Sequence, residues 1–323
     1  MRTRFISALF VGLAAYSSSG AVAATGYTLS ENGRIAFARH GPGADETFTF
    51  TARQDGSDVR RLFTAGPSGE PRWSPDGRRI AVLAACADGA EDCAFTILDA
   101  VTGRVRQVKM HDPKLFTACI VWSPNGKRLA CEGYGEPDSR RNGIYTIRSS
   151  DGRGRERVTA NPGANDQPGD YSPNGTHLVF ARFDKDEHPV GLYVVKTNGR
   201  QLRRITPPGT LISSPGDWSP LGNGIVFARR VSADANNSLW VVRPDGSGLR
   251  EIRLRGGSAC GGSRGCIHPR WSPDGKRIVF SIVTANGGGE IENVYTVKAD
   301  GTGLTQITRT GNTDGTPDWG RAR

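Results

Sequence analysis

A short motif repeats along almost the whole chain at intervals of 47 to 53 residues. It reads Trp-Ser-Pro-Asp-Gly at 73–77, and similar copies that begin with Trp or Tyr stand at 122–126, 171–175, 218–222 and 271–275. A shortened copy, Asp318-Trp319-Gly320, lies near the end of the chain. A repeat of about 40–50 residues is typical of β-propellers, in which each repeat forms one small sheet, or blade, of a ring.

The residues between two motifs predict four short strands. Pro fixes φ and Gly tolerates a positive φ, so Pro-Asp-Gly predicts a tight turn after the first strand. An apolar strand follows, as at 278–280, then an alternating strand, as at 294–297. A second glycine turn precedes a last strand, and its glycines are Gly56, Gly103, Gly152, Gly199, Gly246 and Gly301. Four antiparallel strands joined by hairpins make one blade.

The two ends of the repeat array complement each other. The first unit begins at 32–37 and lacks the aromatic motif, whereas the last unit supplies only 317–320. Together they complete one blade, whose innermost strand comes from the C-terminus. We therefore predict an all-β, six-bladed β-propeller in which this closure removes the exposed sheet edges.

This repeat resembles that of the TolB-type propellers, and the resemblance covers roughly residues 31 to 320. It implies one propeller domain over 24–323, a periplasmic location and binding of envelope proteins. Members of that type also carry an α/β domain before the propeller. Because the first repeat begins so early, we expect a TolB-like propeller without that domain.

The N-terminus predicts export. Arg2 and Arg4 precede an apolar stretch at 5–16, and the small residues at 21–23 suit a signal peptidase. We assign 1–23 to a signal peptide, since the apolar stretch is too short to span a bilayer. A buried first helix is the alternative. No later stretch predicts a membrane span, so we expect a periplasmic or secreted protein.

The charge balance bears on partners. The chain has 42 Lys and Arg against 32 Asp and Glu, a formal net charge of +10. A basic surface favours acidic partners such as an anionic polysaccharide or an acidic protein. The basic residues are scattered rather than clustered, which indicates solubility as the main role, and export argues against nucleic acid. A closed ring without a free edge predicts a monomer.

The six cysteines form three pairs that are close in sequence. An even number in an exported chain predicts disulfides, and none has the C-x-x-C spacing of zinc or redox sites. The expected pairs are Cys86–Cys93, Cys119–Cys131 and Cys260–Cys266. If the turn centres on Asn125, Cys119 and Cys131 face each other across a hairpin.

Two faces of the disc follow from the blade pattern. Both kinds of glycine turn lie on one face, which we call the turn face. The other, the loop face, carries longer and more variable loops, expected at 39–47, 86–93, 183–190 and 256–269, and variable loops on a rigid scaffold often carry binding sites. Four histidines are expected there: His40, His111, His188 and His268.

The residue before each aromatic motif lies on an innermost strand. These six, the channel ring, are Arg72, Val121, Asp170, Asp217, Arg270 and Asp318. Two guanidiniums and three carboxylates predict a polar pocket that binds a peptide segment, a sugar acid or a cation such as calcium. The alternative is that they pair with one another around a water-filled channel. We take the charged members and His268 as the candidate binding residues, and expect no cofactor.

Two functions remain open. The first is a non-catalytic module of the cell envelope that binds a protein or another ligand, with an envelope protein as partner. The alternative is a lyase or hydrolase acting on an anionic carbohydrate or lactone at the channel mouth, for which His188, His268 and Asp217 or Asp170 must converge. The G-x-S-x-G pattern at 261–265 lacks the strand-to-helix context that such a nucleophile needs.

Overall fold

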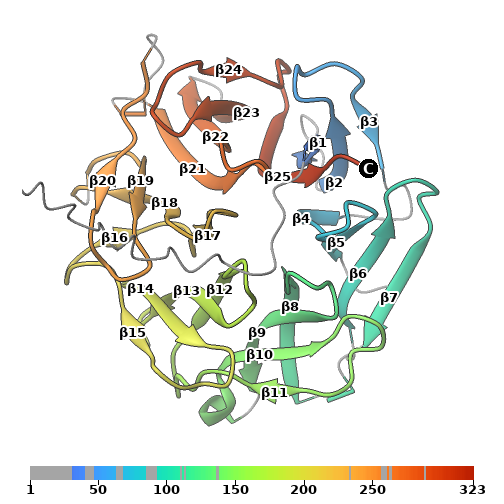
Figure 1. Ribbon diagram of the computed structural model, residues 1–323, viewed down its shortest axis with the longest axis vertical. Coiled ribbons are helices and arrows are strands. Elements are labelled where there is room, and N and C mark those ends of the chain that lie inside the picture. The colour runs from blue at the N-terminus through green and yellow to red at the C-terminus, as the bar shows by residue number, and fades with distance from the viewer. Residues whose placement is uncertain are drawn as a thin grey trace, which may run out of the picture.

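The structure, a computed structural model, is a ring of six antiparallel sheets around a central axis (Figure 1). It describes residues 31–40, 47–62, 68–84, 93–109, 111–112, 114–135, 138–232, 234–255, 260–261, 264–286 and 289–323. The predicted all-β six-bladed propeller is confirmed. In five of the sheets the strand that comes first in the chain lies nearest the axis, and the others follow outwards in chain order. In the sheet that contains both ends of the repeat array, the C-terminal strand is innermost.

The blades are numbered from the N-terminus. Blade 1 contains β25 (Thr313–Arg321), β1 (Asn32–His40), β2 (Thr47–Ala52) and β3 (Arg60–Arg61). Blade 2 contains β4 (Ser68–Trp73), β5 (Arg79–Ala84), β6 (Cys93–Asp99) and β7 (Val105–Lys109). Blade 3 contains β8 (Leu115–Trp122), β9 (Arg128–Gly135), β10 (Gly143–Arg148) and β11 (Glu156–Arg157). A short 3-10 helix, η2 (Ser139–Arg141), lies between β9 and β10.

The second half repeats the arrangement. Blade 4 contains β12 (Asp166–Tyr171), β13 (His177–Phe183), β14 (Pro189–Lys196) and β15 (Arg203–Arg204). In blade 5 the inner strand is split into β16 (Leu211–Ile212) and β17 (Asp217–Trp218), which both pair with β18 (Ile225–Arg230), followed by β19 (Ser238–Val242) and β20 (Arg250–Glu251). Blade 6 contains β21 (Arg264–Trp271), β22 (Arg277–Asn286), β23 (Gly289–Lys298) and β24 (Thr305–Gln306).

The ring closes as the sequence predicts. The C-terminal strand β25 pairs antiparallel with β1, with Trp319 opposite Ile35. Both side chains are buried, and the Trp319 indole donates to the Gly33 carbonyl at 3.2 Å. The first blade is therefore built from both ends of the repeat array, so its inner edge is covered by the last strand.

The repeated motif is explained by one turn. In blade 2 the Ser74 hydroxyl donates to Asp76 at 2.5 Å and accepts from the Arg79 amide at 2.9 Å. Gly77 has a φ of +65°, and a Cβ there would lie 2.8 Å from the Arg321 carbonyl of the neighbouring blade. Glycine is thus required both by the turn and by the close contact between blades.

The core consists of apolar side chains packed between blades. Each second strand contributes fully buried residues, and Phe37, Phe180, Phe227 and Phe280 occupy corresponding positions in four of them. Phe180 stacks on Tyr193 with ring centroids 5.6 Å apart. Burying a side chain of this size stabilises a fold by about 1.5–3 kcal/mol, so this repeated layer is the main apolar support of the ring.

Two of the expected disulfides are present, Cys119–Cys131 and Cys260–Cys266. Cys119 and Cys131 pair directly across β8 and β9 as predicted. Cys86 lies outside the described residues, so the third pair stays a prediction. No helix in the described ranges is long and apolar enough to cross a membrane.

The loop at 256–269 is shorter than expected. Strand β21 already begins at Arg264, so His268 lies on an innermost strand and not in a loop. The expectation failed because Gly-rich sequence precedes Cys266 and hides the start of the strand. Cys266 is fully buried and bonded to Cys260, and the strand pairs with β22 from Arg264 onwards.

Candidate functional site

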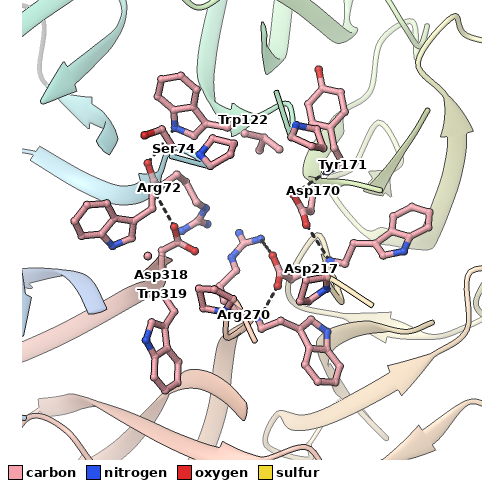
Figure 2. Close-up of a pocket in the computed structure, with 18 of the residues that line it drawn as sticks. Arg72, Ser74, Trp122, Asp170, Tyr171, Asp217, Arg270, Asp318 and Trp319 are labelled. Carbon is pink, nitrogen blue, oxygen red and sulfur yellow. Dashed lines mark hydrogen bonds and ion pairs between the residues drawn. The ribbon is translucent and has the colours of Figure 1, made fainter. Parts of the chain in front are cut away.

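The charged residues of the channel ring converge on the axis. All five line one cavity of about 130 Å³, which also includes prolines of the turn motifs and therefore lies toward the turn face. Figure 2 shows the guanidinium groups of Arg72 and Arg270 and the carboxylates of Asp170, Asp217 and Asp318 directed toward the centre. We call this the turn-side cavity. Its five charged lining residues are those that the repeat predicts at the channel.

The three carboxylates join neighbouring blades. Asp318 accepts a hydrogen bond from the backbone amide of Trp73, the first motif residue of the next blade, at 2.6 Å. Asp217 accepts from the Trp271 amide at 2.6 Å, and Asp170 from the Trp218 amide at 3.2 Å. The same bond recurs because these amides need an acceptor within the buried ring. Each aspartate is therefore a link between two innermost strands.

Arg270 is held by two acceptors. Its Nη1 donates to Asp217 at 3.0 Å and to the Gly169 carbonyl at 3.1 Å, while its Nε is buried without a partner. Burial lowers the pKa of Arg270, but Asp217 and Asp318 outweigh burial, so that this pKa lies above its ordinary value. Among the described residues, Arg270 and Asp217 form the one ion pair between members of the channel ring.

The Arg72 side chain has fewer hydrogen-bond acceptors than the Arg270 side chain. Its Nη1 donates to the carbonyl of its own neighbour Pro71 at 3.1 Å, and its Nε is buried without a partner. Within the described part of the chain no carboxylate forms an ion pair with it. Burial and the adjacent Arg270 lower its pKa to about 10, so the group is still a cation at neutral pH.

Two of the aspartates have raised pKa values. Burial raises the pKa of Asp170 well above its usual value, and the Asp217 charge raises it further, whereas Arg270 opposes the change. Burial also raises the pKa of Asp217 despite the Arg270 contact. Burial thus disfavours the charged form of both aspartates more than Arg270 and the backbone amides favour it.

A second cavity, of about 190 Å³, lies on the other side of the ring toward the loop face. Arg72 and Arg270 line both cavities, and the loop-side cavity adds Glu70, Glu132 and His268. Burial raises the pKa of Glu132, which accepts a hydrogen bond from Tyr134. This loop-side cavity is where the structure places His268.

His268 faces an acidic partner. Its Nδ1 lies 3.7 Å from Oε1 of Glu292, and both atoms are buried without a hydrogen bond. Sequence reasoning missed Glu70, Glu132 and Glu292. Glu132 lies on the second strand of blade 3 and Glu292 on the third strand of blade 6, and nothing in the repeat marks either residue as near the channel.

Three residues beside the channel have unusual backbone. Glu70, His268 and Thr316 have φ values of +47°, +53° and +46°, and each directly precedes a proline. A residue before proline normally adopts extended conformations, so this geometry is costly and the surrounding ring imposes it. The shared X-Pro-X-Trp sequence in blades 6, 1 and 2 was a signal that could have indicated these positions.

The other expected histidines do not join the channel. His188 lies on the hairpin between β13 and β14, is exposed, and lines neither cavity. His40 contacts Thr47, and His111 lies 3.1 Å from the Asp151 carbonyl of the next blade. Asp184, Asp186 and His188 are close enough to share a metal ion, but they form an exposed turn and not a channel site.

The comparisons with known proteins agree with this architecture. The family model described as the TolB beta propeller domain matches residues 25–253. The chain therefore belongs to the TolB β-propeller family. No curated protein sequence matches the chain.

Solved structures show the same fold. TolB from Acinetobacter baumannii superposes with a TM-score of 0.70 at 20% identity, over 92% of this chain and 68% of that one. A putative TolB from Agrobacterium tumefaciens gives 0.63 at 19% identity, over 89% and 92%. An oligogalacturonate lyase from Vibrio parahaemolyticus gives 0.56 at 12% identity, over 88% and 78%. At these identities the likeness concerns the fold alone.

Proposed function

We propose that this chain is an exported, non-catalytic binding module of the cell envelope that holds a protein partner at the loop-side end of its channel. The observation that carries the proposal is the loop-side cavity, whose lining residues His268 and Arg72 each keep a buried nitrogen without a hydrogen bond. A ligand that forms hydrogen bonds with these groups removes the free-energy penalty of burying them unpaired. The rigid ring around them changes little on binding.

Export is part of the proposal. Residues 1–23 act as a signal peptide, and 24–323 form the mature propeller in the periplasm or outside the cell. The two disulfides support this placement, since such bonds persist in oxidising compartments. Membership of the TolB β-propeller family supports an envelope protein as partner, and the basic net charge favours an acidic one.

An enzyme acting on an anionic carbohydrate or lactone is less well supported. That alternative needs His188, His268 and Asp217 or Asp170 around one point. Instead Asp170 and Asp217 line the turn-side cavity, His268 lines the loop-side cavity, and His188 lines neither. Among the described residues the required constellation is not assembled, so binding is the function that the geometry favours.

Capture from an envelope extract tests the binding function. Wild-type protein and the variants His268→Ala and Glu70→Ala are immobilised, washed at rising salt concentration, and their captured proteins identified. We expect one defined envelope protein that survives moderate salt and is lost with both variants. Asp245→Ala, an exposed substitution in a glycine turn, is the matched control and should capture as much as wild type.

Two results would contradict the proposal. One is equal capture by all four proteins, which would place the interaction outside the channel. The other is capture of nothing but salt-labile polysaccharide, which would redirect attention to the enzyme alternative and to assays with sugar acids.

A further inference from the structure

The part of the channel ring beside Arg72 is incomplete. Going around the axis, Asp318 of blade 1 precedes Arg72 of blade 2, and Val121 of blade 3 follows it. Val121 occupies the position that carries an aspartate in blades 1, 4 and 5. Arg72 therefore has a carboxylate neighbour on one side, Asp318 (Figure 2), and an apolar neighbour on the other, Val121.

The three carboxylates of the channel ring already accept hydrogen bonds from other groups. Asp318 accepts from the Trp73 amide, Asp217 is bonded to Arg270 and the Trp271 amide, and Asp170 accepts from the Trp218 amide. Arg72 and Arg270 nevertheless each keep a buried Nε without an acceptor. Arg270 is about nineteen-twentieths buried, so its unpaired donor carries the cost of a desolvated polar group.

The two guanidiniums also repel each other. Arg270 is, after burial, the largest cause of the lowered pKa of Arg72. An anion between them would reduce this repulsion and accept from their free donors. Arginine offers a planar set of donors that matches a carboxylate in two parallel bonds.

The neighbouring wall indicates what else the ligand carries. Ile120 and Val121 are buried, yet both line the turn-side and the loop-side cavities beside Arg72. The cavities, of about 130 and 190 Å³, are large enough for a small molecule only. A fully hydrated inorganic anion would leave this apolar wall without a contact.

We propose that the channel binds a small organic acid, whose carboxylate pairs with Arg72 and Arg270 and whose short apolar body packs on Ile120 and Val121. The inference deepens the proposed function, because it names the chemistry that the channel recognises. The carboxylate comes either from a free acid or from the C-terminus of a peptide chain. Both sources present the same group to the two arginines.

Titration with simple acids tests the inference. The purified protein is titrated with acetate, butyrate and hexanoate in a carboxylate-free, low-chloride buffer, and its melting temperature and binding heat are recorded. We expect saturable stabilisation that is larger for butyrate than for acetate, and none with butyramide, which has the same body without the charge. Inorganic phosphate should bind more weakly than butyrate.

Substitutions localise the site. Arg72→Gln should weaken butyrate binding about 10- to 100-fold, because it removes a charged hydrogen-bonding partner. Arg78→Gln, at an exposed position in the adjacent turn, is the matched control and should bind like wild type. Val121→Asp places a carboxylate next to Arg72 within the chain, and it should abolish binding while circular dichroism shows the same β-sheet content.

A peptide arm separates the two sources. Acetyl-Gly-Gly-Val is compared with its C-terminal amide. Binding of the acid at least about tenfold tighter than butyrate, with no binding of the amide, identifies a chain end as the source. Equal or weaker binding identifies a free acid, and both results support the carboxylate site.

The inference would be overturned if butyrate had no effect, if butyramide acted equally, or if Arg72→Gln bound butyrate like wild type. These failures are independent of the envelope-capture experiment. A defined partner captured without any response to carboxylates would retain the binding function and remove only the acid site.

Discussion

Two arcs of the channel ring use the same sequence position in different ways. From blade 4 to blade 6, Asp170, Asp217 and Arg270 form a connected set of hydrogen bonds to one another's blades. In blades 2 and 3 the corresponding residues are Arg72 and Val121, and neither supplies a carboxylate to the next blade. We call the first the linked arc and the second the open arc.

The difference shows that one repeat position can be structural in one blade and free for binding in another. In the linked arc the charged groups satisfy backbone amides, so replacing them should damage the fold. In the open arc the Arg72 side chain donates, among the described residues, only to the Pro71 carbonyl, so replacing this side chain should cost little. Charge at the channel is therefore not by itself a mark of function.

Removing the closing strand should have the largest effect, because both arcs depend on a closed ring. Deleting 314–323 removes most of β25, which pairs with β1 along its length. We expect the melting temperature to fall by about 10 °C or more, or cooperative unfolding to be lost. Deleting Arg323 alone is the control. An unchanged melting temperature for the longer deletion would disprove closure by this strand.

Breaking the ion pair of the linked arc should come next. Asp217→Ala leaves Arg270 buried without its partner and removes the acceptor of the Trp271 amide, which should cost about 3–5 kcal/mol. Arg72→Met in the open arc should change stability by less than about 1 kcal/mol, because it removes a poorly satisfied cation. Denaturant unfolding measures both, with the exposed Asp234→Ala as control. Similar losses in the two arcs would contradict the comparison.

The open arc has a disulfide that joins two neighbouring strands of one blade. Cys119–Cys131 joins β8 to β9 in blade 3, with a sequence separation of 12. Replacing both by alanine should lower the free energy of unfolding by about 2–3 kcal/mol through loop entropy. The wild-type protein under reducing conditions is the parallel measurement. If neither treatment lowers stability, blade 3 is held by packing alone.

The smallest expected effect is a change with pH. Because the pKa of Asp170 is raised above 3.8, the folded protein holds this proton more tightly than the unfolded chain, and wild-type stability falls as pH rises above about 4. The residue in Asp170→Asn does not titrate, so between pH 4 and pH 7 the free energy of unfolding of this variant should rise by about 1 kcal/mol relative to that of wild type. Unfolding at pH 4 and pH 7 measures the difference. If wild type instead becomes more stable relative to the variant as pH rises, the pKa of Asp170 is lowered in the folded protein.

Much of this was accessible from sequence, for local reasons. A turn depends on residues next to each other, so Pro75 and Gly77 predict the turn that the structure contains at this position, although not the hydrogen bonds of Ser74 with Asp76 and Arg79. The Cys119–Cys131 pairing was also predicted, although the reasoning was incomplete. Beside the turn the partners are Trp122 with Leu129, one residue off the assumed register, and a bulge between Cys119 and Val121 restores it.

Other features depend on contacts between blades. The sequence pointed to a ring of charges, but not to the aspartates' bonds with the amides of the next blade. It placed His268 in a loop, and it gave no sign that Glu292 approaches His268. Such contacts join residues far apart in the chain, and their distances follow from blade tilt and packing rather than from any local pattern.

The sequence by itself determined the number of blades, the turn chemistry, the closure of the ring and the identity of its charged residues, because a repeat imposes the same local geometry each time it occurs. Only the tertiary structure decided which of those charges are used. An aspartate before the motif accepts a hydrogen bond from the next blade's backbone amide. An arginine at that position has only donors, so it cannot accept from this amide. Arg72 is therefore left unsatisfied beside an apolar wall, and this is where we place the ligand.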